Sequence, residues 1–130
     1  MIAVIFEAWV PGEAQAEYLD LAAELRPLLA DLDGFISIER FQSLATPGKV
    51  LSLSFWRDEA AITAWRNLPE HRQVQAAGRD RVFADYRLRI AAVTRDYGKT
   101  ARDEAPADSL AGRTAPEGGS DSGTRPTGAR

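Results

Sequence analysis

The sequence predicts an α+β fold of the ferredoxin-like, split βαβ type, with an antiparallel sheet and helices on one face. Two observations predict it. Apolar residues alternate with a period of two in four segments, and they recur at helical spacing in the segments between them. The segments follow one another in the order strand, helix, strand, strand, helix, strand. A chain of 130 residues has room for one such domain.

The first strand is expected over Met1–Val10, where apolar side chains lie on both faces until Pro11 and Gly12 end the run. The clearest helix follows over Glu13–Leu32, with leucines at helical spacing and acidic residues between them. Pro27 lies inside this helix and should bend it, because proline cannot donate a hydrogen bond to the preceding turn.

Two further strands are expected over Phe35–Gln42 and Val50–Trp56. The loop between them is short and contains Pro-Gly, which predicts an antiparallel hairpin. In the first of these strands, alternation separates two faces: Ile36, Ile38 and Arg40 on one, and Phe35, Ser37, Glu39 and Phe41 on the other.

The second half of the domain is predicted to be mainly helical. Asp58 is placed to cap a helix over Glu59–Leu68, and Pro69 fits the first turn of another. A last strand is expected over Tyr86–Tyr97. We expect residues 1–99 to form the domain and residues 100–130 to be a disordered tail, because the tail has too few large apolar residues to offset chain entropy.

The predicted sheet has one face without helices, yet its first strand is apolar on both sides. An apolar face must be covered, and a second copy of the chain is the simplest cover. The sequence therefore predicts a homodimer in which two sheets pack together.

Composition excludes several classes of function. The net charge is −3 and basic residues alternate with acidic ones, so neither nucleic acid nor a membrane surface is an expected partner. The chain has no cysteine and one histidine, which leaves no metal site with a recognisable motif. No signal sequence or membrane-spanning run is evident, and we expect a cytoplasmic protein.

Three parts of the sequence resemble the antibiotic biosynthesis monooxygenase (ABM) superfamily of dimeric α+β barrels. They are Gly34–Phe41, Leu53–Ala61 together with Trp65, and Pro69–Gln75. The resemblance covers Met1 to about Gly98. It implies a homodimer and an oxygenase acting on a small molecule, but it specifies no single reaction.

Two branches of the superfamily match the sequence in part. In the cofactor-free branch that oxidises polyketide phenols, Trp56 matches a pocket tryptophan, whereas Ser52 and Ile62 stand at the positions of its Asn and Tyr. In the haem-degrading branch Trp65 matches a tryptophan of the haem site, but Gln75 stands where that branch has histidine. The resemblance therefore favours the branch without a cofactor.

The candidate binding residues lie on two predicted strands. Ser52, Ser54 and Trp56 share one face of their strand, and Ser37 and Glu39 share a face of the neighbouring strand. Small hydroxyls at positions that usually hold Val or Ile fit a ligand cavity under the helices. The alternative is that this face meets the second subunit. The match of Trp56 favours the cavity.

His71 is the candidate catalytic residue. Its side chain is the only one in this sequence whose unperturbed pKa lies near neutrality, so it is the natural proton acceptor. A histidine near a helix start is otherwise often an exposed or capping residue. Trp65 and Tyr86 are candidates for stacking on a planar substrate, although buried aromatic residues are commoner in a small core. Arg72 and Arg79 share a helix face that either steers an anion or is simply solvated.

These residues lead to three hypotheses of function. The first is a cofactor-independent monooxygenase, or a related proton-transfer enzyme, that acts on a small aromatic or quinol-like compound with His71 as base. The second is a haem-binding or haem-degrading protein. The third is a dimeric barrel that binds a small ligand without catalysis.

Overall fold

The structure, a computed structural model, describes residues 1–109 of the chain, except for the surroundings of Gly78 and the side chain of Asp80. It divides into two units, Met1–Val93 and Thr94–Arg130. In the second unit, the guanidinium of Arg102 lies over the ring of Tyr97, 5.1 Å from its centroid. Residues 110–130 of the predicted tail lie outside the described residues.

The first unit contains one four-stranded antiparallel sheet in the order β2-β3-β1-β4. The strands are β1 (Ile2–Trp9), β2 (Phe35–Gln42), β3 (Lys49–Trp56) and β4 (Asp85–Ala92). This topology confirms the ferredoxin-like α+β fold and the hairpin of β2 with β3. The last strand ends earlier than the sequence predicted.

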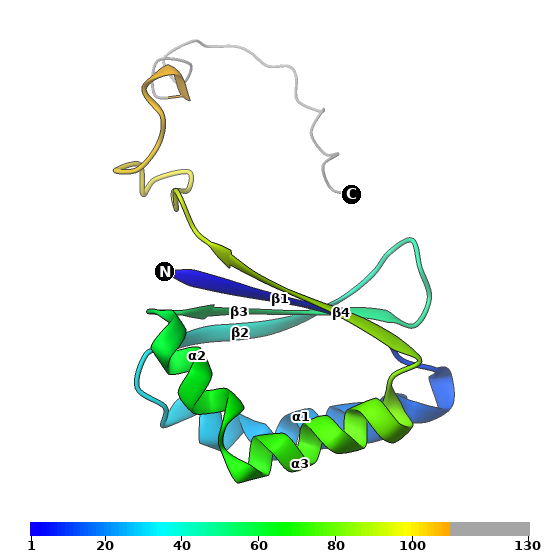
Figure 1. Ribbon diagram of the computed structural model, residues 1–130. Helices are drawn as coiled ribbons and strands as arrows, with labels where there is room; N and C mark the ends of the chain where they lie inside the picture. The colour runs from blue at the N-terminus through cyan, green and yellow to red at the C-terminus, as the bar shows by residue number, and fades with distance from the viewer. Residues whose placement is uncertain (110–130) are drawn as a thin grey trace. The chain divides into compact units, whose positions relative to one another are not determined.

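The helices of the first unit all lie on the same side of the sheet (Figure 1). They are α1 (Gln15–Ala30), α2 (Glu59–Arg66) and α3 (Pro69–Ala77), with short helical turns at Gly12–Ala14 and Gly78–Val82. The predicted cap is present, since a carboxylate oxygen of Asp58 accepts the Ala61 N–H at 3.0 Å. Within residues 1–109, no helix has both the length and the apolar character to cross a membrane.

The residue alternation of each strand decides what faces the helices. Strand β1 turns Val4 and Phe6 toward the helices, where they pack into the core, and its odd positions toward the other face. On that helix-free face Glu7 forms ion pairs with Lys49 at 3.3 Å and with Arg89 at 3.2 Å. The charged residue in an otherwise apolar strand therefore has its partners on both neighbouring strands.

The predicted faces of β2 were wrong at its start, because the strand contains a β-bulge there. The register slips between Phe35 and Ser37, which brings the Phe35 ring against Trp56 with centroids 5.3 Å apart. Ile36 is left exposed. A bulge inserts one residue into a strand and reverses the faces of those before it, so simple alternation failed at this point.

Two clusters of buried apolar side chains hold the helices to the sheet. One surrounds Trp56 and Trp65, and the other surrounds Val10 and Val82. The aromatic contacts of Trp56 with Phe35 and of Trp65 with Trp56 add directional packing to the first cluster. A cavity borders members of both clusters.

Candidate functional site

The cavity lies between the sheet and the helices and has a volume of about 230 Å³. All four strands and the three α-helices contribute side chains to it, and most of these are apolar. Its wall on β4 consists of Tyr86, Leu88 and Ile90, which remain exposed. The cavity therefore opens beside β4, one of the two edge strands.

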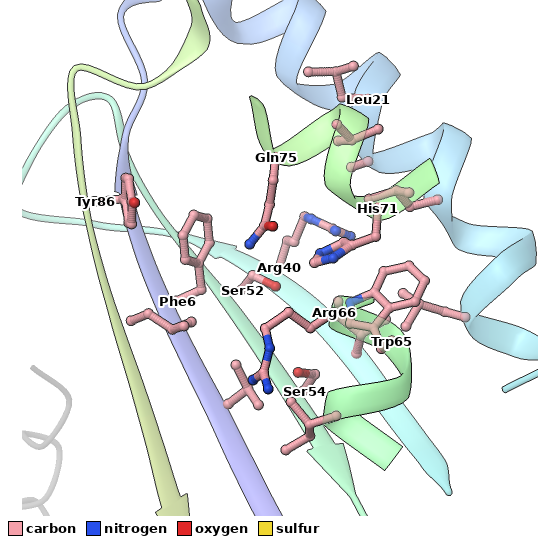
Figure 2. Close-up of a pocket in the computed structure, with 18 of the residues that line it drawn as sticks. Phe6, Leu21, Arg40, Ser52, Ser54, Trp65, Arg66, His71, Gln75 and Tyr86 are labelled. Atoms are coloured by element: carbon pink, nitrogen blue, oxygen red, sulfur yellow. The ribbon is translucent and has the colours of Figure 1, made fainter. Parts of the chain in front are cut away.

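Polar groups gather in one part of this apolar cavity. Figure 2 shows Arg40, Ser52 and Ser54 projecting from the sheet, with Arg66, His71 and Gln75 projecting from the helices opposite. A small apolar cavity with a few convergent polar groups is the common form of a small-molecule site.

His71 is held in place by aromatic packing and by its position at the start of α3. It is the third residue of this helix, which begins at Pro69 as predicted. Its ring lies against Trp65, with centroids 4.5 Å apart and the planes inclined by 38°. Nδ1 is buried and has no hydrogen-bond partner among the described residues. Nε2 is therefore the ring nitrogen left for a ligand.

Burial lowers the pKa of His71 below its ordinary value of 6.5, because it disfavours the charged imidazolium. The backbone carbonyl of Arg66 opposes this effect by favouring the protonated form. At neutral pH the imidazole is neutral and has the lone pair that a general base requires.

Trp56 forms the deepest part of the wall. It is only 2% exposed, and its indole N–H donates to the Ser54 hydroxyl at 2.9 Å. Ser54 can still donate its own proton, because a hydroxyl both accepts and donates. Ser52 lines the same wall and is buried, with 9% of its surface exposed.

The structure brings most of the predicted site residues to this cavity. They are His71, Trp56, Trp65, Ser52, Ser54 and Tyr86. It does not bring Glu39 there. Glu39 pairs with Leu53 in the sheet, and this places it on the helix-free face, where it is exposed. Of the two predicted helix arginines, Arg79 lines the cavity and Arg72 does not.

Sequence reasoning missed Arg40 and Arg66 as site residues. Arg40 was already predicted on the same strand face as Ile38, and a charge on an apolar strand face was the available signal. Arg66 directly follows Trp65 at the end of α2, and no pattern in the sequence distinguished it from a solvated surface residue.

No carboxylate lines the cavity, although three arginines do: Arg40, Arg66 and Arg79. The described part of the chain also holds no cluster of His, Cys, Asp or Glu side chains suited to a metal ion. The site therefore combines an apolar body, a neutral imidazole and an excess of positive charge.

Residues 1–77 match the family model of the antibiotic biosynthesis monooxygenases. The chain belongs to this family. The family relationship confirms the resemblance that the strand and helix motifs indicated, and it includes the segments that carry Trp56, Trp65 and His71.

Two relatives extend the comparison to the family's individual members. The jasmonate monooxygenase ABM of Pyricularia oryzae is 49% identical over 94 residues, which cover 72% of this chain and 44% of that protein. The uncharacterised protein YqjZ of Bacillus subtilis is 32% identical over 93 residues, which cover 72% of this chain and 79% of YqjZ. The match thus spans less than half the length of the jasmonate monooxygenase.

Two solved structures have a similar fold. SnoaB, a cofactor-independent oxygenase from Streptomyces nogalater, matches with a TM-score of 0.65 and 16% identity, covering 73% of this chain and 94% of SnoaB. Rv0793 from Mycobacterium tuberculosis matches with a TM-score of 0.67 and 16% identity, covering 75% and 98% of the two chains. At such identity the likeness concerns the fold.

Proposed function

We propose that this protein is a monooxygenase that takes a small, largely apolar substrate into the cavity and oxidises it with dioxygen, without a bound cofactor. The observation that carries the proposal is the position of His71, a neutral imidazole packed on Trp65 in the wall of an apolar cavity. Membership of the monooxygenase family supports it.

His71 acts as the general base in this proposal. Because Nδ1 is covered by protein and cannot reach a substrate, we assign the proton of the neutral ring to Nδ1. Nε2 then carries the lone pair and takes a proton from the substrate. The apolar wall of Trp56 and Trp65 excludes water and leaves the resulting anion reactive toward oxygen.

The oxygen chemistry needs no external reductant when the substrate has an acidic CH₂ group. After His71 takes the proton, the carbanion gives one electron to O₂, and the substrate radical and superoxide combine to form a carbon–oxygen bond. The resulting peroxide recovers the proton and loses water. In total R₂CH₂ and O₂ give R₂C=O and H₂O, so one oxygen atom enters the product.

The cavity volume limits the substrate. About 230 Å³ is smaller than the roughly 300–1,000 Å³ of cavities for drug-sized ligands. Jasmonate is a small cyclopentanone that carries a carboxylate, and its C–H bonds beside the ketone are acidic. The name of the Pyricularia oryzae relative makes jasmonate and related small ketones the first compounds to test, with small hydroquinones beside them.

Haem does not fit this site. Gln75 lines the cavity at the position where the haem-degrading branch has its histidine, and an amide is a poor ligand for haem iron. The cavity is also too small for a porphyrin. Titration of the protein with haemin should therefore give no shift of the Soret band.

The test is oxygen consumption by the full chain with jasmonate and a panel of hydroquinones. His71→Gln keeps the size of the side chain and removes the base, and it should lower turnover roughly 10²-fold or more. Glu70→Gln is the matched control, since Glu70 is exposed one position earlier on α3 and does not line the cavity. Unchanged turnover in His71→Gln would contradict the assignment of the base.

A further inference from the structure

We infer that Arg40 and Ser52 form a carboxylate-binding site in the cavity wall, so that the substrate is a small apolar carboxylate. This inference deepens the proposed function, because it takes the same cavity as the substrate site. It is carried by the lining of the cavity and not by the identity of any relative.

Arg40 is an unusual residue for its position. It is half-buried on the helix-facing side of β2, two residues along the strand from the apolar Ile38. Its Nε donates to the Tyr18 hydroxyl at 3.3 Å, and Tyr18 is itself buried in the core. This contact holds the guanidinium by one donor and leaves the four N–H groups of its two terminal nitrogens for a ligand.

Ser52 completes the site from the neighbouring strand. Arg40 and Ser52 are directly paired in the β2–β3 register, and such cross-strand pairs have Cβ atoms about 4.5–5.5 Å apart. Figure 2 shows both side chains projecting toward the part of the cavity that holds His71. A guanidinium and a hydroxyl on one face offer a carboxylate both a forked donor and a further hydrogen bond.

No protein carboxylate serves as the partner of Arg40 within the described residues. Arg57, Arg81 and Arg89 each form an ion pair with an Asp or Glu, whereas Arg40 forms none there. Partly burying a cation without an anion is unfavourable. A ligand carboxylate would remove this cost, and the apolar remainder of the cavity would hold the ligand's carbon skeleton.

The other two cavity arginines have a different position. Arg66 and Arg79 are exposed, and the contact of Arg66 with the Thr63 hydroxyl, at 3.4 Å, is long. Exposed cations attract an anion over several ångströms but bind it weakly in water. They would raise the rate of entry, whereas Arg40 and Ser52 would set the preference for the bound carboxylate.

Isothermal titration calorimetry without turnover tests the inference, with naphthylacetate and naphthylacetamide as probes. The two differ in charge and hardly in shape. The acid should bind at least about tenfold more tightly than the amide, as a charge-assisted hydrogen bond exceeds a neutral one. Arg40→Met should reduce this preference to within about twofold, and Ser52→Ala should reduce it by about threefold, while affinity for the amide stays nearly constant.

Three further variants make the outcome specific. Arg26→Met, on the exposed side of α1 and outside the cavity, should keep the preference of the unmodified protein. His71→Gln should also keep it, so that failure of the catalytic proposal and failure of this one can be told apart. Equal binding of acid and amide, no binding of the acid at millimolar concentration, or a preference lost in Arg66→Met but kept in Arg40→Met would overturn the inference.

Discussion

The imidazole of His71 packs on the indole of Trp65, and the indole of Trp65 in turn lies 6.4 Å, centroid to centroid, from that of Trp56. The candidate base is therefore joined to the most deeply buried aromatic side chain of the core. Its protonation state depends on packing at Trp65, because burial is the largest influence on its pKa.

The first prediction is that Trp65→Leu raises the pKa of His71 toward 6.5. The substitution removes the ring that covers the imidazole, so the charged form is less disfavoured. Titration by NMR is direct, since the chain has one histidine and its ring signals need no assignment. The free energy of unfolding should also fall by at least about 2 kcal/mol from lost core packing.

Trp9→Leu is the matched control for that titration. Trp9 lies in β1 with Lys49 over its ring, 4.9 Å from the centroid, and it does not line the cavity. Its replacement should leave the pKa of His71 unchanged. A pKa of His71 at or above 6.5 in the unmodified protein would contradict the burial that the structure shows.

The second prediction concerns pH. Burial lowers the pKa of His71 in the folded state, so the neutral base persists to a pH below 6.5. Turnover should be constant near neutrality and fall on the acid side, with a midpoint equal to the pKa measured by NMR. Arg40, Arg66 and Arg79 line the same cavity. A midpoint that His71→Gln leaves in place would assign the titration to another group.

The same pKa shift affects stability. The unfolded chain binds a proton at His71 near pH 6.5, whereas the folded chain binds it only at lower pH. Stability should therefore decrease as the pH falls from about 6.5 through the folded-state pKa, and this dependence should disappear in His71→Gln.

The order of the elements was predictable from the sequence because it depends on apolar periodicity, which the sequence carries directly. The hairpin of β2 and β3 and the cap at Asp58 were predictable for the same reason. The faces of Phe35 and Ile36 were not. They depend on a bulge, and no residue between Gly34 and Ser37 distinguishes a bulged strand from a regular one.

The candidate site was predictable where a residue type limits the chemistry, as at His71. It was less predictable where only the position of a residue in its strand decides whether the side chain faces the cavity. Glu39 and Arg40 are adjacent in β2, and alternation sends Arg40 to the cavity and Glu39 to the opposite face. Which face is the cavity side follows from where the helices pack, and this is a tertiary property.

The third prediction is that Gly34→Ala destabilises the domain. Gly34 has a φ of +90°, and a Cβ there would lie 2.6 Å from the Ala61 Cβ. The left-handed conformation alone costs a non-glycine residue about 1–2 kcal/mol, and the clash adds to this. The melting temperature should fall by about 4–8 °C or more. Gly12→Ala, with no atom within 4 Å of its added Cβ, should change it little.

The fourth prediction is that residues 1–99 fold without the rest of the chain. The sheet, the helices and both core clusters lie in Met1–Val93. The shortened chain should melt within a few degrees of the full chain in thermal denaturation followed by circular dichroism. A decrease equivalent to more than about 1 kcal/mol would show that the tail contributes to the fold.

The last prediction is that two copies of the chain associate through the helix-free face of the sheet. Ile5 and Leu53 are cross-strand partners at the centre of that face, and no helix of residues 1–93 covers it (Figure 1). Leu53→Glu places a charge there and should convert a dimer into a folded monomer at micromolar concentration, because burying an unpaired carboxylate is costly. Leu19→Glu is the control, since Leu19 is 60% exposed on α1 and its change should leave the mass unchanged. Light scattering measures both. A monomeric unmodified protein, or a Leu53→Glu variant that remains dimeric, would show that this face is not the interface.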